Sequence, residues 1–165
     1  MHLKAVTLTL EEIDQYFKTH KELDDLCVYA LLTDLRAASI HYFKKYPNRA
    51  LCLRFLERIM EIRENEDWEL GHGENIMLAM YLIGLHGEPE DALLLYETKI
   101  FDYDTFCGVD VQLIVFAGVS QTLKYLQSLK TEEGNKALRF LSECEAAGDF
   151  LEIEEYFSER LPWWV

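Results

Sequence analysis

Residues 76–85, IMLAMYLIGL, form an apolar run in the middle of a chain of 165 residues. The run is about half as long as the roughly 20 residues that a membrane-spanning helix needs, so it predicts a buried helix. Since it is apolar all round, we expect a helix over 75–86 to lie at the centre of the fold. Gly87 should end this helix, and Pro89 should open the next one.

Capping residues and helical spacing predict three helices before this run. Thr9 and Glu12 match a capping box that opens the first helix. A second helix is expected over 22–46, with one apolar face and Pro47 just beyond its end. Asn48 is expected to cap the third helix, whose apolar residues recur at helical spacing.

Further helices are predicted after the apolar run, although one segment is ambiguous. The length and β-branched residues of VQLIVFAGV suit a buried strand as well as a helix. We predict a helix over 109–119, because no second strand pattern is available to pair with it. Ser120, Thr131 and Asp149 are expected to cap three more helices, the last of which ends near Pro162.

These short helices, joined by short connections, predict an all-α fold built from antiparallel helix pairs. The succession of pairs after residue 74 is typical of a HEAT-like α-solenoid, although no internal repeat aligns. No linker or low-complexity tract divides the chain, so residues 1–165 are expected to form a single helical domain.

The net charge of −14 comes entirely from one part of the chain. Residues 1–65 carry ten Lys/Arg and ten Asp/Glu, whereas residues 66–165 carry six and twenty. Such a negative field repels nucleic acid and anionic membranes and attracts cationic surfaces. We therefore predict a basic protein partner, with neither nucleic acid nor membrane as a target.

Cysteine usage and the N-terminus predict a cytoplasmic protein. The four cysteines are widely spaced and form no C-x-x-C motif, which favours free thiols in a reducing compartment. They are Cys27, Cys52, Cys107 and Cys144. The N-terminus lacks the basic and apolar segments of a secretion signal.

The stretch IFDYDTFCGVDVQL, residues 100–113, carries three aspartates. Its DYDT matches the D-x-D-x-T pattern of haloacid-dehalogenase-like phosphotransferases, in which the first aspartate is a nucleophile and the second an acid/base. That chemistry needs the motif at the end of a buried parallel strand, which the preceding LLLYETKIF does not resemble. A metal-dependent hydrolase or phosphotransferase using Asp102 and Asp104 therefore stays an alternative, and we predict no enzyme activity.

No metal site or cofactor is predicted. Counted from Asp102, the sixth and twelfth residues are Cys107 and Leu113, whereas a calcium-binding EF-hand loop needs glycine and glutamate there. His72 and His86 adjoin glycines in loops, where histidines are usually not ligands.

The same aspartates are explained structurally as helix caps. Asp102 or Asp104 can accept hydrogen bonds in the turn after the fifth helix, and Asp110 can cap the next helix. One acceptor suffices per helix start, so a surplus aspartate beside Tyr103 and Phe106 would form a charged aromatic edge. Such edges recognise Arg or Lys at protein interfaces.

The sequence FDYDTFCGVDVQL, followed by AGV, T and YL within residues 101–126, resembles a family of small helical immunity proteins of bacterial polymorphic-toxin systems. The resemblance covers about a sixth of the chain. It implies a cytosolic protein that binds and blocks one cognate toxin without catalysis. It transfers no inhibitory residue to this sequence.

An acidic run over 143–160 is either a solvated helix face or a docking face for a basic partner. Trp163 and Trp164 either fold back onto the core or anchor an interface. Trp68 lies in an acidic loop, which favours a surface role. We predict the following partner contacts: Trp68, Asp102, Tyr103, Asp104, Glu152, Glu154 and Glu155.

The function predicted from these features is a non-enzymatic inhibitor, a bacterial immunity protein that occupies the cationic groove of a basic toxin. The alternatives are the metal-dependent enzyme and a structural helical adaptor.

Overall fold

The computed structural model describes residues 7–65, 69–158 and 161–165. The first five helices are α1 (Leu10–His20), α2 (Asp25–Leu32), α3 (Arg36–Lys45), α4 (Arg49–Glu64) and α5 (Gly73–Gly84). The later ones are η1 (Pro89–Asp91), α6 (Ala92–Lys99), α7 (Tyr103–Gly108), η2 (Val111–Val115), α8 (Val119–Leu129), α9 (Glu132–Ala147) and α10 (Ile153–Tyr156), where η1 and η2 are 3₁₀ helices.

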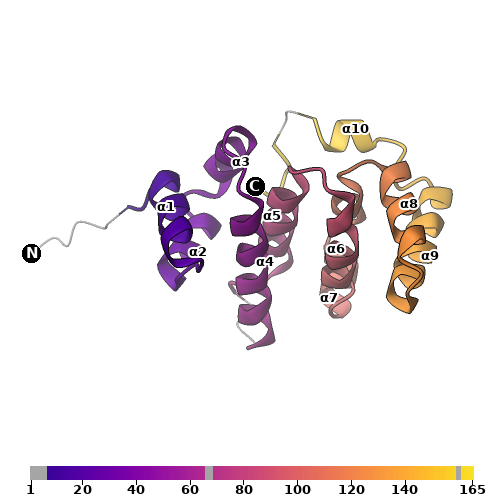
Figure 1. Ribbon diagram of the computed structural model, residues 1–165, viewed down its shortest axis with the longest axis horizontal. Coiled ribbons are helices and arrows are strands. Elements are labelled where there is room, and N and C mark those ends of the chain that lie inside the picture. Colours follow the sequence, from indigo (N-terminus) through magenta and orange to yellow (C-terminus); the bar gives the residue numbers. More distant parts are fainter. Residues whose placement is uncertain (1–6, 66–68, 159–160) are drawn as a thin grey trace, which may run out of the picture.

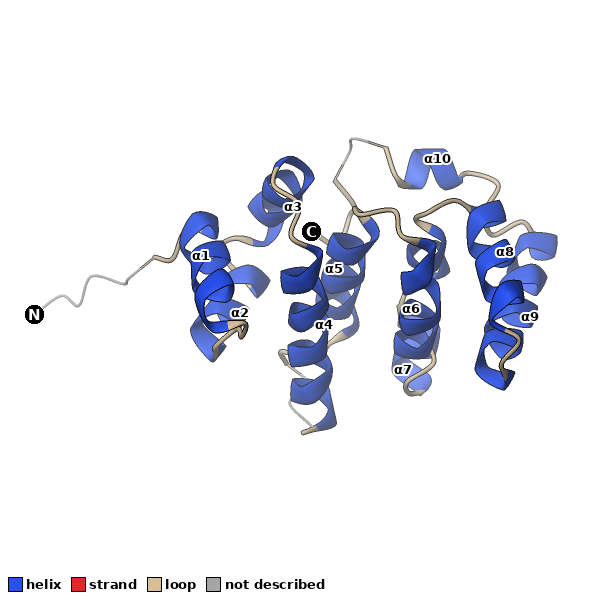
Figure 2. Ribbon diagram, viewed as in Figure 1, coloured by secondary structure: helices blue, strands red, loops and turns tan. Residues whose placement is uncertain are grey.

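The helices stand side by side in a row that runs from α1 and α2 at one end to α8 and α9 at the other (Figure 1). Within the described ranges all regular secondary structure is helical, which confirms the all-α fold class (Figure 2). The most extensive packing joins α4 to α5 and α8 to α9, which are consecutive along the chain. The finer HEAT-like assignment stays a prediction.

Helix α5 lies at the centre of the core, as its sequence predicted. Every residue from Asn75 to Gly84 is buried, because α5 packs against α4, α3, α7 and η2. The buried apolar side chains form one cluster that extends from Leu10 in α1 to Trp164 near the C-terminus. A helix without a polar face is stable only when neighbours surround it in this way.

Three predicted helix starts are confirmed by their capping hydrogen bonds. Thr9 and Glu12 form the complete capping box of α1. The Asn48 side chain accepts a hydrogen bond from the amide of Leu51, and Thr131 does the same for Gly134. Each bond satisfies an amide that has no partner within its own helix.

The predicted single helix over 22–46 is wrong, because the chain breaks between α2 and α3. Thr33 ends α2 with φ −118° and ψ −96°, and its hydroxyl donates to the carbonyl of Tyr29. Thr and Asp side chains compete with the helical backbone for hydrogen bonds, and Thr33 and Asp34 stand together here. The break starts a new helix at Arg36, whose side chain binds the distant C-terminal segment.

The predictions for the C-terminal third also need correction. Instead of one α-helix, the segment 109–119 contains the short 3₁₀ helix η2 and the first residue of α8. Ser120 does not cap α8, which begins one residue earlier after Gly118, at a φ of 101° that glycine tolerates. The helix predicted from Asp149 to Pro162 is reduced to α10, and α7 was not predicted.

Helix α10 lies along one edge of the row, and the C-terminus lies near the centre of the row beside α5 (Figure 1). Arg36 holds it by donating from Nε and Nη2 to the carbonyl of Trp164, at 3.2 and 3.0 Å. The Trp164 ring packs edge-on against Tyr81 of α5 and is buried, whereas Trp163 is 77% exposed. Of the two tryptophans, one therefore completes the core and the other faces solvent.

Candidate partner-binding surface

Asp102, a predicted partner contact, is the N-cap of α7. Its Oδ1 accepts from the amide of Thr105 at 2.8 Å, and the Thr105 hydroxyl accepts from the amide of Asp102 at 3.0 Å. The two residues therefore close a capping box, in which each satisfies a free amide of the other. The predicted role of Asp102 or Asp104 as a helix cap is therefore confirmed for Asp102.

The same carboxylate forms an internal ion pair with α4. Arg63 donates from Nε to Oδ2 of Asp102 at 2.6 Å and from Nη2 to Oδ1 at 2.9 Å, and its Nη1 donates to the carbonyl of Gly71 at 2.7 Å. The Arg63 side chain is only 3% exposed and that of Asp102 27%. The hydrogen bond from Arg63 is the main cause that lowers the pKa of Asp102. Asp102 is thus largely neutralised within the fold.

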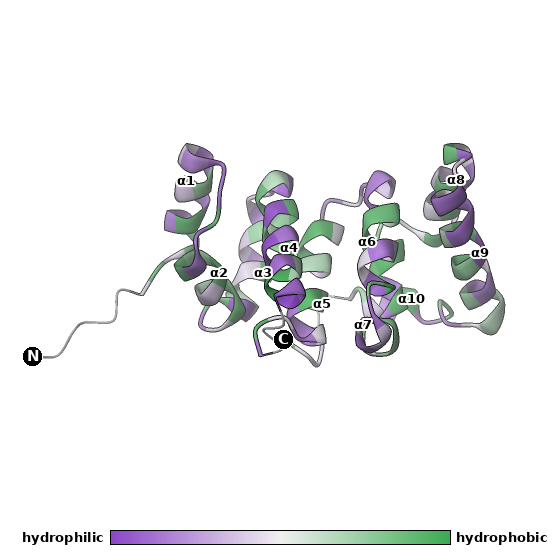
Figure 3. Ribbon diagram, turned by 90° about the horizontal axis from the view of Figure 1, so that it is seen from below, coloured by the Kyte–Doolittle hydropathy of each residue, from purple (hydrophilic) through white to green (hydrophobic). Residues whose placement is uncertain are grey.

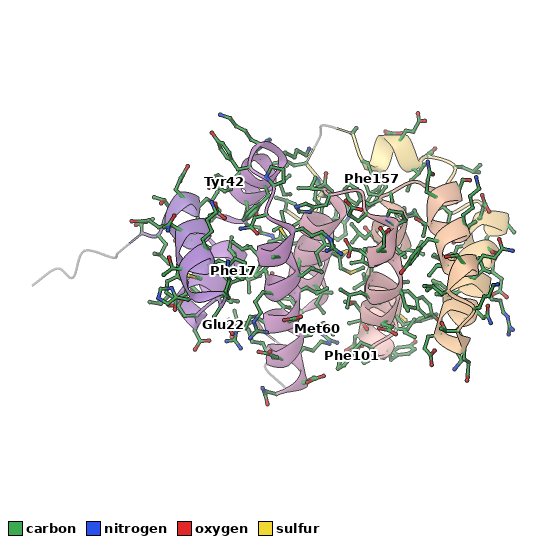
Figure 4. All side chains as sticks on the ribbon, viewed as in Figure 1. Phe17, Glu22, Tyr42, Met60, Phe101 and Phe157 are labelled. Carbon is green, nitrogen blue, oxygen red and sulfur yellow. The ribbon has the colours of Figure 1, made fainter. Side chains whose placement is uncertain are left out.

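The two residues after Asp102 face solvent. Tyr103 is 80% exposed, and the Asp104 side chain is 76% exposed, with an oxygen 3.8 Å from Nη2 of Arg63. Phe101 and Phe106 are also exposed, and Phe101 lies at the lower end of α6 and α7 (Figure 4). We call Phe101, Tyr103, Asp104 and Phe106 the α7 edge. It is a charged aromatic surface of the kind that protein interfaces use.

A second acidic surface surrounds α10, where a cavity of about 400 Å³ opens beside η2 and the end of α9. The lining includes Asp149, Glu152 and Glu155, together with Gln112 and Tyr156, and no Lys or Arg among the described residues. We call this site the acidic cavity. Leu151 at its rim is 87% exposed, so an apolar contact adjoins the carboxylates.

Two long-range hydrogen bonds shape the acidic cavity. The Tyr156 hydroxyl donates to Oδ2 of Asp110 at 2.8 Å, and Gln112 donates from Nε2 to the carbonyl of Asp149 at 3.0 Å. Burial, with a smaller contribution from Asp110, raises the pKa of Tyr156, which therefore stays a neutral donor. The first bond ties α10 to the residue before η2, and the second ties η2 to the segment before α10. Asp110 serves this purpose instead of the predicted helix cap.

A further cavity borders both the α7 edge and the acidic cavity. Its volume is about 380 Å³, and it is lined by Phe106 of the α7 edge and by Gln112 and Asp149, which also line the acidic cavity. Its one described cation, Lys99, is buried and donates from Nζ to the carbonyls of Phe106 and Val109, both at 2.6 Å. Seen from below, α7 and α10 lie on the same side of the helix row (Figure 3), although at opposite ends of the helices (Figure 1).

Charge pairing differs between the two parts of the chain. In α4, Arg54 binds Glu22, Glu57 and Glu61, while Arg58 binds Asp25 and Glu61. These arginines of α4 are therefore neutralised by acids of the same part of the chain. In contrast, the exposed carboxylates Asp149, Glu152, Glu154 and Glu155 form no ion pair within the part of the chain that the structure describes.

The structure thus places the predicted contact residues in different situations. Tyr103 and Asp104 are exposed on the α7 edge, and Glu152 and Glu155 line the acidic cavity beside the exposed Glu154. Trp68 lies outside the described residues. Gln112 and Leu151, which also line the acidic cavity, were not predicted from the sequence. The only sequence signal is that Leu151 is an apolar residue within an acidic run.

The aspartates of the alternative enzyme site lie outside the structural context that the D-x-D-x-T motif needs. The described residues contain no strand, so DYDT is not at the end of one, and Arg63 and the amide of Thr105 already occupy the Asp102 carboxylate. The described residues also contain no group of three His, Cys, Asp or Glu side chains placed to hold a metal ion.

None of the described helices combines the length and the apolar character that a membrane span requires. Comparisons of the chain with protein-family models, with curated proteins and with solved structures give no match.

Proposed function

We propose that this protein is a non-enzymatic inhibitor that binds a basic protein through the acidic cavity and the α7 edge. The observation that carries the proposal is a set of three carboxylates around a cavity with no cation in its described lining. They are Asp149, Glu152 and Glu155, and none forms an ion pair with another described residue. A Lys or Arg side chain of a partner fits such a cavity, because carboxylates accept charge-assisted hydrogen bonds from it.

The proposed biological role is that of a cytoplasmic bacterial immunity protein that neutralises a cognate toxin. The carboxylates would occupy the cationic substrate groove of the toxin, and opposed fields would speed the encounter. Support comes from the exposed carboxylates in and before α10, which form no ion pair with another described residue, and from the exposed aromatic rings of the α7 edge. Asp102 is left out of the proposed contacts, because Arg63 already holds it.

The test uses the toxin encoded next to this protein in its host, expressed as an isolated toxin domain. Binding and residual toxin activity are measured with the native protein and with the double variant Glu152→Gln/Glu155→Gln. We expect tight, salt-sensitive binding that inhibits the toxin, and an affinity about tenfold lower for the variant.

The matched control is Glu143→Gln/Glu145→Gln, which removes the same charge from exposed positions of α9 outside the cavity. If the control weakens binding as much as the cavity variant, the cavity is not the contact site. A toxin that binds but stays fully active would leave only the structural adaptor. The absence of any binding to the neighbouring toxin would exclude the immunity role.

A further inference from the structure

A second cleft, of opposite charge, lies at the other end of the helix row from the acidic cavity. It has a volume of about 610 Å³ and is bounded by α1, the end of α3 and the start of α4. Figure 4 labels Phe17 on α1 and Tyr42 on α3, which both line it. Small-molecule sites commonly have volumes of roughly 300–1,000 Å³, so this cleft has the size of a ligand site.

Three lysines from two helices converge on this cleft. Lys18 and Lys21 come from the end of α1, and Lys45 is the last residue of α3. All three side chains belong to exposed residues. All three belong to residues 1–65, whose acids and bases balance, so this cleft lies outside the acidic part of the chain.

The cleft contains one described carboxylate, which is already neutralised. Asp14 is 6% exposed and accepts from Nζ of Lys18 and from Nδ2 of Asn48, both at 2.6 Å. Tyr42 donates more weakly to it, at 3.5 Å. Of the three lysines, only Lys18 forms an ion pair with Asp14.

Lys21 and Lys45 form no ion pair with a carboxylate anywhere in the described ranges. Lys45 instead lies 5.0 Å from the centre of the Tyr46 ring, and Tyr46 remains 49% exposed. Two lysines without an ion pair thus line the same cleft as an exposed aromatic ring, and one of them, Lys45, lies beside that ring.

The positions of these lysines also have a simpler explanation. Both follow or end a helix, where a cation offsets the partial negative charge of the last carbonyls. Lys21 caps α1 in the left-handed conformation, with φ 56°, and Lys130 does the same at the end of α8, with φ 54°. Helix capping explains why a lysine stands at the C-terminal end of α1 and another at that of α3. It does not explain why these two helix ends line one cleft together with two tyrosines.

We propose that this cleft binds a small organic phosphate with a planar ring, whose phosphate lies between Lys21 and Lys45 and whose ring packs against Tyr46. Lysine ammonium groups suit phosphate as point charges, and two of them match the charge of about −2 on a phosphomonoester. Tyr42 and Tyr46 provide the apolar wall that a planar ring prefers.

The experiment measures binding of phenyl phosphate, inorganic phosphate and phenol to the full chain by calorimetry and by NMR chemical-shift changes. We expect saturable binding of phenyl phosphate with shifts confined to α1, α3 and the start of α4. Inorganic phosphate should bind more weakly at the same site, and phenol weakest of all. No saturable binding of phenyl phosphate would overturn the proposal.

Two pairs of variants distinguish binding in this cleft from a general effect of removing a positive charge. Lys21→Gln and Lys45→Gln should each weaken phenyl phosphate binding by about five- to tenfold, as expected for loss of a charge-assisted contact. The matched controls are Lys130→Gln, which shares the helix-cap geometry of Lys21, and Lys44→Gln, which neighbours Lys45 but does not line the cleft. Equal weakening by the controls would overturn the proposal, as would a Tyr46→Leu variant that binds phenyl phosphate as tightly as the native protein.

Discussion

Arg63 in α4 and Asp102 before α7 are joined by two parallel hydrogen bonds, although 39 residues separate them in the chain. The pair fastens α7 to α4, and the arginine is almost fully buried. A buried charge is stabilised only while its partner remains. The pair therefore contributes to the stability of the fold, although Asp102 lies next to the exposed α7 edge.

We predict that Asp102→Ala lowers the free energy of unfolding by about 3 kcal/mol, because it leaves Arg63 buried without its carboxylate and removes the α7 cap. Urea denaturation followed by circular dichroism measures the change. Asp104→Ala is the matched control, since that side chain is 76% exposed, and it should change stability by less than about 0.5 kcal/mol. Equal effects of the two substitutions would contradict the internal role of Asp102.

The same pair predicts a specific dependence of stability on pH. Arg63 lowers the pKa of Asp102 in the folded state, while the unfolded chain keeps the ordinary value of about 3.9. The stabilisation is therefore complete above that value and is lost as pH falls through the lowered pKa. Asp102→Asn should be less stable than the native protein at neutral pH, and the difference should shrink in acid. Urea midpoints measured across the acidic range test this, and a constant difference would refute it.

Gly84 in α5 allows the close approach of Phe116. A Cβ atom at Gly84 would lie 2.2 Å from Cδ2 of Phe116, and that ring is already packed against Tyr81 and Phe157. We expect Gly84→Ala to destabilise the protein by about 2 kcal/mol through overpacking. Thermal denaturation measures it.

Gly73→Ala is the control for this substitution, because nothing lies within 4 Å of the added Cβ. It should leave the melting temperature unchanged or raise it slightly, since alanine favours a helix over glycine by up to about 1 kcal/mol. A tolerant Gly84→Ala variant would show that η2 is free to move away from α5.

The adjacent tryptophans at the C-terminus should respond very differently to truncation. Trp164→Ala removes a buried ring from Tyr81 and should lower the free energy of unfolding by about 3 kcal/mol. Trp163→Ala removes a ring that is 77% exposed and should change it by less than about 0.5 kcal/mol. Chemical denaturation of both variants measures these free energies. A large loss of stability in Trp163→Ala would mean that this ring is buried in solution, for instance between two copies of the chain.

The carboxylates of the acidic cavity should be dispensable for folding. Glu152→Gln/Glu155→Gln breaks no ion pair of the described residues, so its unfolding free energy should stay within about 0.5 kcal/mol of the native value or rise as repulsion falls. The unfolding midpoint is the measurement. A large loss of stability would show that these acids hold the fold together instead of facing a partner.

Several features were predicted from local sequence because their physical causes are local. The capping box of Thr9 and Glu12 involves residues three apart, and so do the caps at Asn48 and Thr131. The all-apolar composition of 76–85 sufficed to place α5 in the core. The concentration of acid after residue 65 also follows from the sequence alone, and with it the prediction of a basic partner.

The tertiary structure decided what depends on partners far away in the chain. The break after Thr33 separates α2 from α3, and Arg36 reaches the carbonyl of Trp164 across 128 residues. Periodicity carries no sign of such a contact. Periodicity also could not distinguish Asp102 from Asp104. The difference between them depends on which carboxylate lies against Arg63 of α4. Local sequence determines where helices tend to start and how charge is distributed, whereas the packing of the helices determines which charges are neutralised and which remain at the surface.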